Sequence, residues 1–427
     1  MGSEVIKNIL KDVEIPRFLR VRQIFDETHI ERNEIEQHIK NILPSLNLGD
    51  SIRPGMRIAL TAGSREICNM NEILRSIVAE LRKLGAEPFI IPAMGSHGGA
   101  TAEGQRELLA GYGITEDYCR CPILSSMETV RIGQVSDGRD VFIDRHAHEA
   151  DGILVIGRVK LHTDFRGRYE SGIMKMMAIG LGKQKGAASC HEQGFGRMAY
   201  NVAEFGHAVL TNCRILGAIA IVENAFDKTN ALIALKPEEI EDREPEILEY
   251  AKQRMPRIYF PACDVLIVDE LGKNYSGVGM DANVSGRHAT KFSSGGIQSQ
   301  KLAVLGMSEK THCNGLGIGL ADVTTKRVAE ALDTEAMYVN GLTSRVLNTC
   351  NIPCAFDNDR LAIQACIYTS VGIGPNGPKI IRIPNTLHLQ EIMVTENYAD
   401  EIAGMHEIEL ISDPFELKFD KEGFLIR

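Results

Sequence analysis

Short apolar runs alternate with longer amphipathic segments from about residue 56 onward, and this alternation constrains the fold more than any other feature of the sequence. Residues 56–61 and 88–92 have the length and composition of buried strands. Between them, Ile73, Ile77 and Leu81 recur at helical spacing. Strand, helix and strand in this order are typical of a mainly parallel sheet covered by helices, so the predicted fold class is α/β.

The same pattern predicts two domains. A chain of 427 residues is long enough for two or three. An acidic, solvated helical stretch ends at Met255 and Pro256, and a new apolar run begins soon after. We therefore expect a larger N-terminal cofactor-binding α/β domain over residues 1–256 and a smaller α/β domain over residues 257–427. Further strands are expected at 140–143, 152–156, 215–222, 263–268, 302–305 and 318–320, with a terminal β region at 380–383, 407–411 and 416–419. Asp322 is expected to cap a helix at 323–332.

Charge and cysteine usage exclude several classes of protein. The net charge is −10, and the basic residues form no block that would favour nucleic acid or an anionic membrane surface. The ten cysteines include no CxxC pair, which argues against a zinc ribbon or a disulfide scaffold. The N-terminus has no long apolar core, and no apolar run is long enough to span a membrane. We expect a cytoplasmic protein that acts on small molecules.

Three polar segments follow predicted strands, namely TAGSRE at 61–66, MGSHGGAT at 94–101 and RVKLHTD at 158–164. In open α/β sheets, ligands bind beyond the carboxyl ends of the strands, so Arg65, His97 and His162 are candidates for one site. A planar guanidinium such as Arg65 suits a substrate carboxylate. Each histidine also has a simpler interpretation, an imidazole in a tight turn for His97 and a residue of a charged surface loop for His162.

Two further candidates lie downstream. Lys175 stands among apolar and small residues in SGIMKMM, residues 171–177. Burial there would lower the pKa of its amine and make the neutral form available for covalent attachment, although a lysine that extends to solvent fits the same pattern. His191 is either a metal ligand or a polar residue at a turn.

Taken in order, five features resemble the nickel-pincer-nucleotide family typified by lactate racemase. They are GSREI at 63–67, GSHGGAT at 95–101, KLHTD at 160–164, SGIMK at 171–175, and His191. The resemblance implies an α/β N-terminal domain, a smaller C-terminal domain and an active site between them. It also implies a nickel-pincer nucleotide, the nickel complex of pyridinium-3,5-bisthiocarboxylic acid mononucleotide, bound covalently to the protein.

By this resemblance, Lys175 carries the cofactor through a thioamide, Ser171 and Gly172 belong to the same cofactor-binding motif, and His191 completes the coordination of nickel. His97 and His162 act as the two bases, one for each enantiomer, with Arg65 as a third catalytic residue. The implied enzyme is an isomerase, a racemase or epimerase of a 2-hydroxy acid that works by proton-coupled hydride transfer. Its implied partners are that acid and the enzymes that make the cofactor.

Departures from the family pattern point away from lactate. Lactate racemases have an arginine where Gly98 stands and an aspartate near the position of Ala62 and Gly63. A sugar acid or a hydroxydicarboxylate is a more suitable substrate, and several polar residues of the second domain are available to bind it or to form a hinge loop. These residues are Lys273, Asn274, Asp281, Asn283 and Arg287.

Two other functions remain open from the sequence. One is a zinc- or iron-dependent hydrolase or lyase in which His97, His162 and His191 bind the metal directly. The other is a non-catalytic binding protein built on the same fold.

Overall fold

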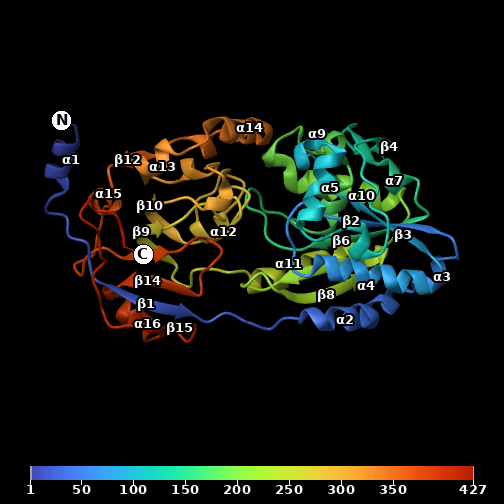
Figure 1. Cartoon of the computed structure of the whole chain (residues 1–427), viewed down its shortest axis with the longest axis horizontal. Coiled ribbons are helices and arrows are strands. Elements are labelled where there is room, and N and C mark those ends of the chain that lie inside the picture. The colour runs from blue at the N-terminus through green and yellow to red at the C-terminus, as the bar shows by residue number, and fades with distance from the viewer. Residues whose placement is uncertain (1, 427) are drawn as a thin grey trace. The chain divides into compact units, whose positions relative to one another are not determined.

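The computed structural model describes residues 2–426 and divides into two compact units. One unit spans Glu27–Met255, and the other combines the chain up to Asp26 with Pro256–Arg427. The first 26 residues belong to the same unit as the C-terminal part of the chain. The reason is that β1 (Phe18–Gln23) pairs with β14 (Glu391–Thr395) on one side and with β15 (Ile408–Leu410) on the other (Figure 1).

The unit of residues 27–255 is built on a five-stranded sheet with the order β3-β2-β6-β7-β8. The first four strands are parallel, and β8 pairs antiparallel at the edge. This arrangement confirms the predicted mainly parallel α/β fold. The strands are β2 (Arg57–Ala62), β3 (Glu87–Pro92), β6 (Gly152–Arg158), β7 (Ile215–Glu223) and β8 (Thr229–Leu235).

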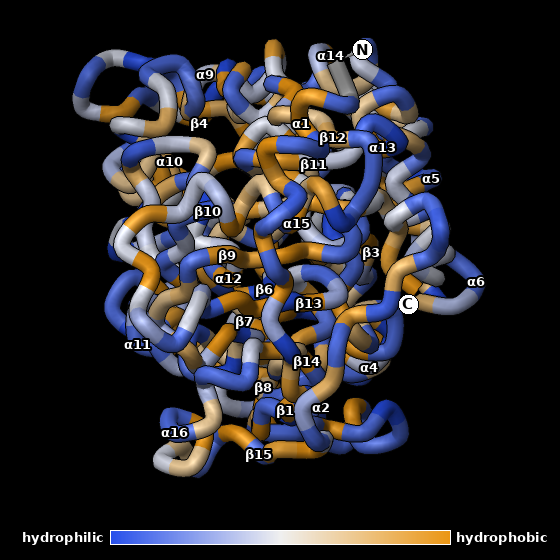
Figure 2. Tube along the Cα trace, turned by 90° about the vertical axis from the view of Figure 1, so that its left-hand side faces the viewer, coloured by the Kyte–Doolittle hydropathy of each residue, from blue (hydrophilic) through white to orange (hydrophobic). Residues whose placement is uncertain are grey.

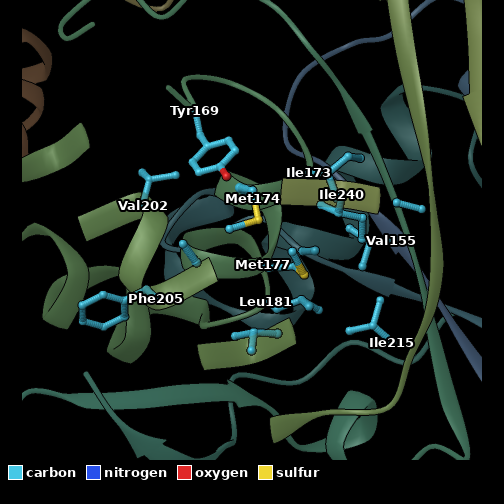
Figure 3. Close-up of a cluster of buried hydrophobic side chains, with 14 of the residues drawn as sticks. Val155, Tyr169, Ile173, Met174, Met177, Leu181, Val202, Phe205, Ile215 and Ile240 are labelled. Atoms are coloured by element: carbon cyan, nitrogen blue, oxygen red, sulfur yellow. The ribbon is translucent and has the colours of Figure 1, made fainter. Parts of the chain in front are cut away.

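Both faces of this sheet are covered, which explains why its strands are continuously apolar. On β6, Ile153 and Val155 belong to one buried cluster, and Leu154 and Ile156 belong to the other. Met174 and Met177 pack in the first cluster (Figure 3). Helices α8 (Ile173–Lys175), α10 (Met198–Asn212) and α11 (Ile240–Arg254) lie on that face, and α2 (Ile35–Ile42) and α4 (Met70–Lys83) lie on the other.

The remaining elements of this unit are short. The predicted cap is confirmed, because the Thr101 hydroxyl accepts the Gly104 N–H at 3.0 Å at the start of α5. The strand expected at 140–143 forms as β5 (Asp140–Asp144), but it pairs with β4 (Thr129–Gln134) in an antiparallel ribbon separate from the main sheet. These elements are α3 (Leu48–Ser51), α5 (Ala102–Gly111), α6 (Glu116–Cys119), β4 (Thr129–Gln134), β5 (Asp140–Asp144), α7 (Arg145–His148) and α9 (Lys183–His191).

The second unit contains an eight-stranded sheet with the order β12-β11-β10-β9-β13-β14-β1-β15. The first five strands in this order, from β12 to β13, are parallel to one another. The pairs β13–β14, β14–β1 and β1–β15 are antiparallel. Its strands are β9 (Ala262–Val268), β10 (Gln298–Val304), β11 (Val323–Thr325), β12 (Cys354–Phe356) and β13 (Ile380–Ile383), with β1, β14 and β15. Its helices are α1 (Gly2–Leu10), α12 (Ala282–Ser285), α13 (Lys326–Glu330), α14 (Thr334–Ser344), α15 (Asp359–Thr369) and α16 (Ala399–Ile402).

Hydropathy follows this organisation in both units. Figure 2 shows hydrophobic residues along strands such as β7 and β9 and hydrophilic residues along α11.

The helix predicted to begin at Asp322 does not begin there. Residues 323–325 form strand β11, and Thr325 caps α13 instead. The carboxylate of Asp322 is occupied elsewhere, since it accepts the Leu302 N–H at 2.8 Å and pairs with Arg287 at 2.7 Å.

Replacement of Phe18 by alanine should destabilise the second unit. Phe18 is fully buried in β1, so truncation leaves a cavity and should lower the free energy of unfolding by about 3–5 kcal/mol. Urea denaturation measures this change. The control is Arg20→Ala on the exposed side of the same strand. An equal, small effect of both substitutions would contradict the position of β1 inside the sheet.

Candidate functional site

The candidate residues lie on loops that leave one edge of the five-stranded sheet. Arg65 follows β2, His97 follows β3 and His162 follows β6. These three strands are parallel neighbours, with β2 in the middle. Because adjacent strands lie about 5 Å apart, loops that follow their carboxyl ends begin close together.

The segments that carry His162 and Lys175 are joined through their backbones. Lys160 and Ser171 exchange two hydrogen bonds, with N···O distances of 2.9 and 3.1 Å. The buried carboxylate of Glu170 accepts the backbone N–H of His162 at 2.7 Å. This short antiparallel pairing holds the His162 loop against the turn that leads into Lys175.

The turn around Lys175 has an unusual backbone. Lys175 ends the short helix α8, which continues into a π-helical turn, η4 (Met176–Gly180), where the Leu181 N–H donates to the Met176 carbonyl at 2.9 Å. Turns of this kind are rare in proteins overall, but those that occur are often found at functional sites.

The carboxylate of Glu244 in α11 supports the start of this turn. It accepts the backbone N–H of Met174 at 2.8 Å and a second hydrogen bond from the backbone of Ile173. Gly172 is required there, because a Cβ at this position would overlap the Glu244 carboxyl group. Although the sequence predicted a solvated helix, Glu244 is 1% exposed, and burial raises its pKa to about 8. Its Oε1 atom has no hydrogen-bond partner among the described residues.

The Lys175 side chain is half-buried, and its amine has no hydrogen-bond or ion-pair partner in the part of the chain that the structure describes. Burial lowers the pKa of this amine to about 8. Asp164 opposes the shift, whereas the positive charges of Arg65 and Lys160 add to it. At pH 7 about one tenth of Lys175 is therefore an uncharged nucleophile, far more than for an exposed lysine.

His162 is held as a neutral ring. Burial lowers its pKa well below the usual value, and nearby positive charge, that of Lys175 foremost, adds to the effect. The backbone N–H of Asp164 donates to His162 Nδ1 at 3.0 Å, so the proton of the neutral ring is on Nε2. In this form His162 presents a hydrogen-bond donor at Nε2.

His191 lies near His162 at the last residue of α9. The rings of the two histidines flank Phe195, with centroid distances of 5.9 Å from His191 and 6.5 Å from His162. His191 also contributes to the lowered pKa of His162. The neighbouring Cys190 is buried, and burial raises the pKa of its thiol to about 12, so it stays protonated.

His97 is exposed on the loop after β3. Its Nδ1 contacts the Met94 carbonyl at 2.8 Å, and because a carbonyl only accepts, Nδ1 carries the proton. The proton-accepting nitrogen of this ring is therefore Nε2. The Gly95 N–H donates to the Gly180 carbonyl at 3.2 Å, which joins this loop to the end of the π-helical turn that follows Lys175.

Arg65 is an exposed cation with no side-chain hydrogen bond or ion pair among residues 2–426. Loss of surrounding water lowers its pKa, and the positive charge of Arg158 acts in the same direction. Arg158 itself pairs with Glu223 at the end of β7. Arg65 is thus available to an anionic group.

The polar residues that the sequence singled out in the second unit make contacts within that unit. Arg287 pairs with Asp322, Lys273 donates to Asn340, and Asn274 accepts from Ser308 at 2.5 Å. Asp281 caps α12 by accepting the Asn283 N–H at 2.9 Å. These contacts give each of the five residues a role in shaping its own loop.

Direct metal binding by three histidines has no support in this geometry. Residues 2–426 contain no group of three or more His, Cys, Asp or Glu side chains placed to hold a metal ion. A metal that brings most of its own ligands and needs only one imidazole is compatible with the arrangement around His191. None of the described helices has the length and apolar character needed to cross a membrane.

The fold and the site together define an α/β protein with a desolvated lysine and two nearby histidines at the edge of a parallel sheet. Residues 1–200 match the family model of the lactate racemase N-terminal domain. The structure is similar to that of the lactate racemase apoprotein from Thermoanaerobacterium thermosaccharolyticum, with a TM-score of 0.52 and 13% identity over 86% of this chain and 93% of the other, which shows a shared fold. No curated protein matches the chain.

Residues 1–200, a little under half of the chain, thus resemble the N-terminal domain of lactate racemases. This likeness supports a racemase- or epimerase-type role, that of an isomerase, at the level of the family.

The amine of Lys175 should react much faster than ordinary lysines. With a pKa of about 8, its neutral fraction at pH 7 is about 300-fold larger than that of an amine with the usual pKa of ~10.5. Reductive methylation at pH 7 followed by peptide mass spectrometry should therefore modify Lys175 first. Exposed Lys185 is the internal control, and equal rates at both lysines would contradict the desolvated position of Lys175.

Glu244→Gln should change the pH dependence of stability. The raised pKa means that folded Glu244 holds a proton that the unfolded chain loses, so this group lowers the free energy of unfolding as pH rises from about 4.5 to about 8. Glutamine keeps the oxygen that accepts the Met174 N–H and removes this effect.

Urea denaturation between pH 5 and 8 should therefore show the substituted protein gaining stability relative to the original as pH rises. Glu246→Gln, on an exposed part of α11, controls for the loss of a negative charge. A constant difference across this range would refute a buried, protonatable Glu244.

Proposed function

We propose that this chain is a racemase or epimerase of a 2-hydroxy acid and that it uses a nickel-pincer nucleotide attached to Lys175. The observation that carries the proposal is the state of the Lys175 amine, which is half-buried, unpaired among the described residues and shifted to a pKa of about 8 beside His162 and His191. An uncharged amine in this position is suited to condense with a thiocarboxylic acid group, which forms a thioamide N–C bond, breaks the C–O bond and releases water.

The residues present fit such a cofactor. Lys175 supplies the nucleophilic nitrogen, and the backbone of Ser171 and Gly172, fixed by Lys160 and Glu244, sets the direction of the turn that carries it. His191 would donate an imidazole nitrogen to nickel, the single protein ligand that a square-planar site with sulfur and carbon donors still requires. When bound, the cofactor supplies a hydride acceptor next to the substrate carbon.

His97 and His162 have complementary roles in the tautomers that their hydrogen bonds indicate. Nε2 of His97 accepts the proton of the substrate hydroxyl, because its Nδ1 already carries one. Nε2–H of His162 donates a hydrogen bond to the substrate oxygen. Reaction of the opposite enantiomer requires the two rings to exchange these roles.

Arg65 would bind the substrate carboxylate, since it is exposed, planar and without a partner among the described residues. The glycine at position 98, where a lactate racemase has an arginine, leaves more room at the site, and the missing aspartate near positions 62 and 63 offsets the lost positive charge. The added room supports a larger substrate than lactate, such as a sugar acid or a hydroxydicarboxylate. Loading of the cofactor would depend on the enzymes that make it.

The test is a turnover assay in deuterium oxide. Protein produced together with the cofactor-making enzymes is incubated with single enantiomers of sugar acids, hydroxydicarboxylates and lactate. We expect chiral chromatography to detect inversion of a sugar acid or hydroxydicarboxylate. Mass spectrometry should show retention of most of the original α-hydrogen, since hydride transfer does not exchange it with solvent.

His97→Gln and His162→Gln should each lower kcat by about 100-fold or more, as expected for loss of a general acid–base group. Full exchange of the α-hydrogen with solvent would contradict hydride transfer. Binding without inversion of any acid would instead support a non-catalytic protein, and zinc or iron with unmodified Lys175 would support a hydrolase or lyase.

A further inference from the structure

Lys183 is fully buried, which is exceptional for a lysine and serves no step of the proposed reaction. It begins α9, the helix that ends at His191, and its φ of 53° lies in the left-handed region that side chains other than glycine rarely adopt. Burial lowers the pKa of its amine, and Asp144 opposes this shift. A buried charge on a strained backbone persists only where its surroundings hold it firmly.

Three groups from different elements hold the Lys183 amine. It pairs with the carboxylate of Asp144 at 3.0 Å, and both side chains are 0% exposed. It also donates to the Pro92 carbonyl at the end of β3 at 2.5 Å and to Oε1 of Gln105 in α5 at 3.1 Å. The contact with Asp144 is an ion pair and the other two are hydrogen bonds, so one negative charge and two acceptors compensate the burial of the amine.

Gln105 extends this network to the loop that carries His97. Its Nε2 donates to the Gly95 carbonyl at 3.0 Å and to the His97 carbonyl at 3.2 Å. Because the Lys183 ammonium can contact only the oxygen of the amide, it fixes which end of Gln105 faces the loop. Reversal of the amide would place an oxygen against two carbonyls.

The His97 loop needs such support, because it has little regular structure of its own. Gly95 and Gly98 have φ values of 56° and 66°, and Ala100 has a φ of 54°. The contacts from Gln105 fix the backbone on both sides of Ser96, next to the Met94 carbonyl that holds Nδ1 of His97.

We propose that Lys183, acting through Gln105 and balanced by Asp144, is the positioning residue that fixes the orientation and tautomer of His97. The expected effect of Lys183 on turnover rests on the proposed function, whereas its effect on the His97 tautomer does not. Since Lys183 and His191 begin and end one nine-residue helix, the same network also joins the His97 loop to the proposed nickel ligand.

The first test is Gln105→Glu, which keeps an oxygen for Lys183 but replaces the two N–H donors that face the loop. Gln184→Glu is the matched control, because Gln184 is exposed beside Lys183. A second variant, Lys183→Met with Asp144→Asn, removes both buried charges together so that neither is left unpaired.

The main measurement needs no cofactor. Histidine-selective ¹⁵N labelling of the apoprotein, with the His97 signals assigned by His97→Gln, reports which ring nitrogen carries the proton. We expect the Nδ1–H form in the original protein and in Gln184→Glu. In Gln105→Glu and in the double variant we expect the mixture of tautomers that an unrestrained ring adopts.

With the loaded enzyme, kcat should fall roughly 10- to 100-fold in Gln105→Glu and in the double variant, with little change in KM. An unchanged His97 tautomer in both would overturn the proposal. If no acid is inverted by the original protein but the tautomer still depends on Gln105, the proposed function fails and the positioning role stands.

Discussion

Removal of the Lys175 amine from water is the physical effect on which the account of this site depends. It lowers the pKa of the lysine to about 8. Burial of His162 itself, together with the neighbouring positive charges, lowers the pKa of that ring and keeps it neutral. The desolvation comes from the packing of the segment around Lys175 against the parallel sheet, where Met174 and Met177 are fully buried. The chemistry of the site is therefore a consequence of the hydrophobic core beneath it.

Buried polar groups then fix how the loops of the site are arranged on this apolar core. Glu170 accepts the backbone N–H of His162, and Glu244 accepts that of Met174, so each carboxylate satisfies backbone donors that the irregular segments leave unpaired. Lys183 provides a corresponding brace on the side of His97. A charge inside a protein is costly unless it is bonded, so these groups fix one arrangement of the loops more strictly than apolar contacts would.

Local patterns predicted strands such as β2, β3, β6, β7 and β9, helix α4, the Thr101 cap and the edge of the sheet where the candidates lie, because periodicity and glycine positions are read within about ten residues. They did not predict β1, β4, β8 or β14, and residues 318–320, which were expected to be a strand, form a 3-10 turn. Asp322 was a wrong cap, since a short strand delays the helix to Thr325. The partners of β1 are about 370 residues away in sequence, and nothing local specifies them. Burial of Glu244 also depends on distant elements, so the acidic composition of its helix predicted solvent exposure instead of internal support.

The most direct measurement of the central claim is the state of Lys175 in protein isolated from cells that also make the nickel-pincer nucleotide. Peptide mass spectrometry of that protein, together with metal analysis, identifies the modified residue and the metal content. The account predicts a covalent adduct on the peptide that contains Lys175 and about one nickel per chain. Nickel-containing protein with unmodified Lys175, or an adduct on a different lysine, would contradict it.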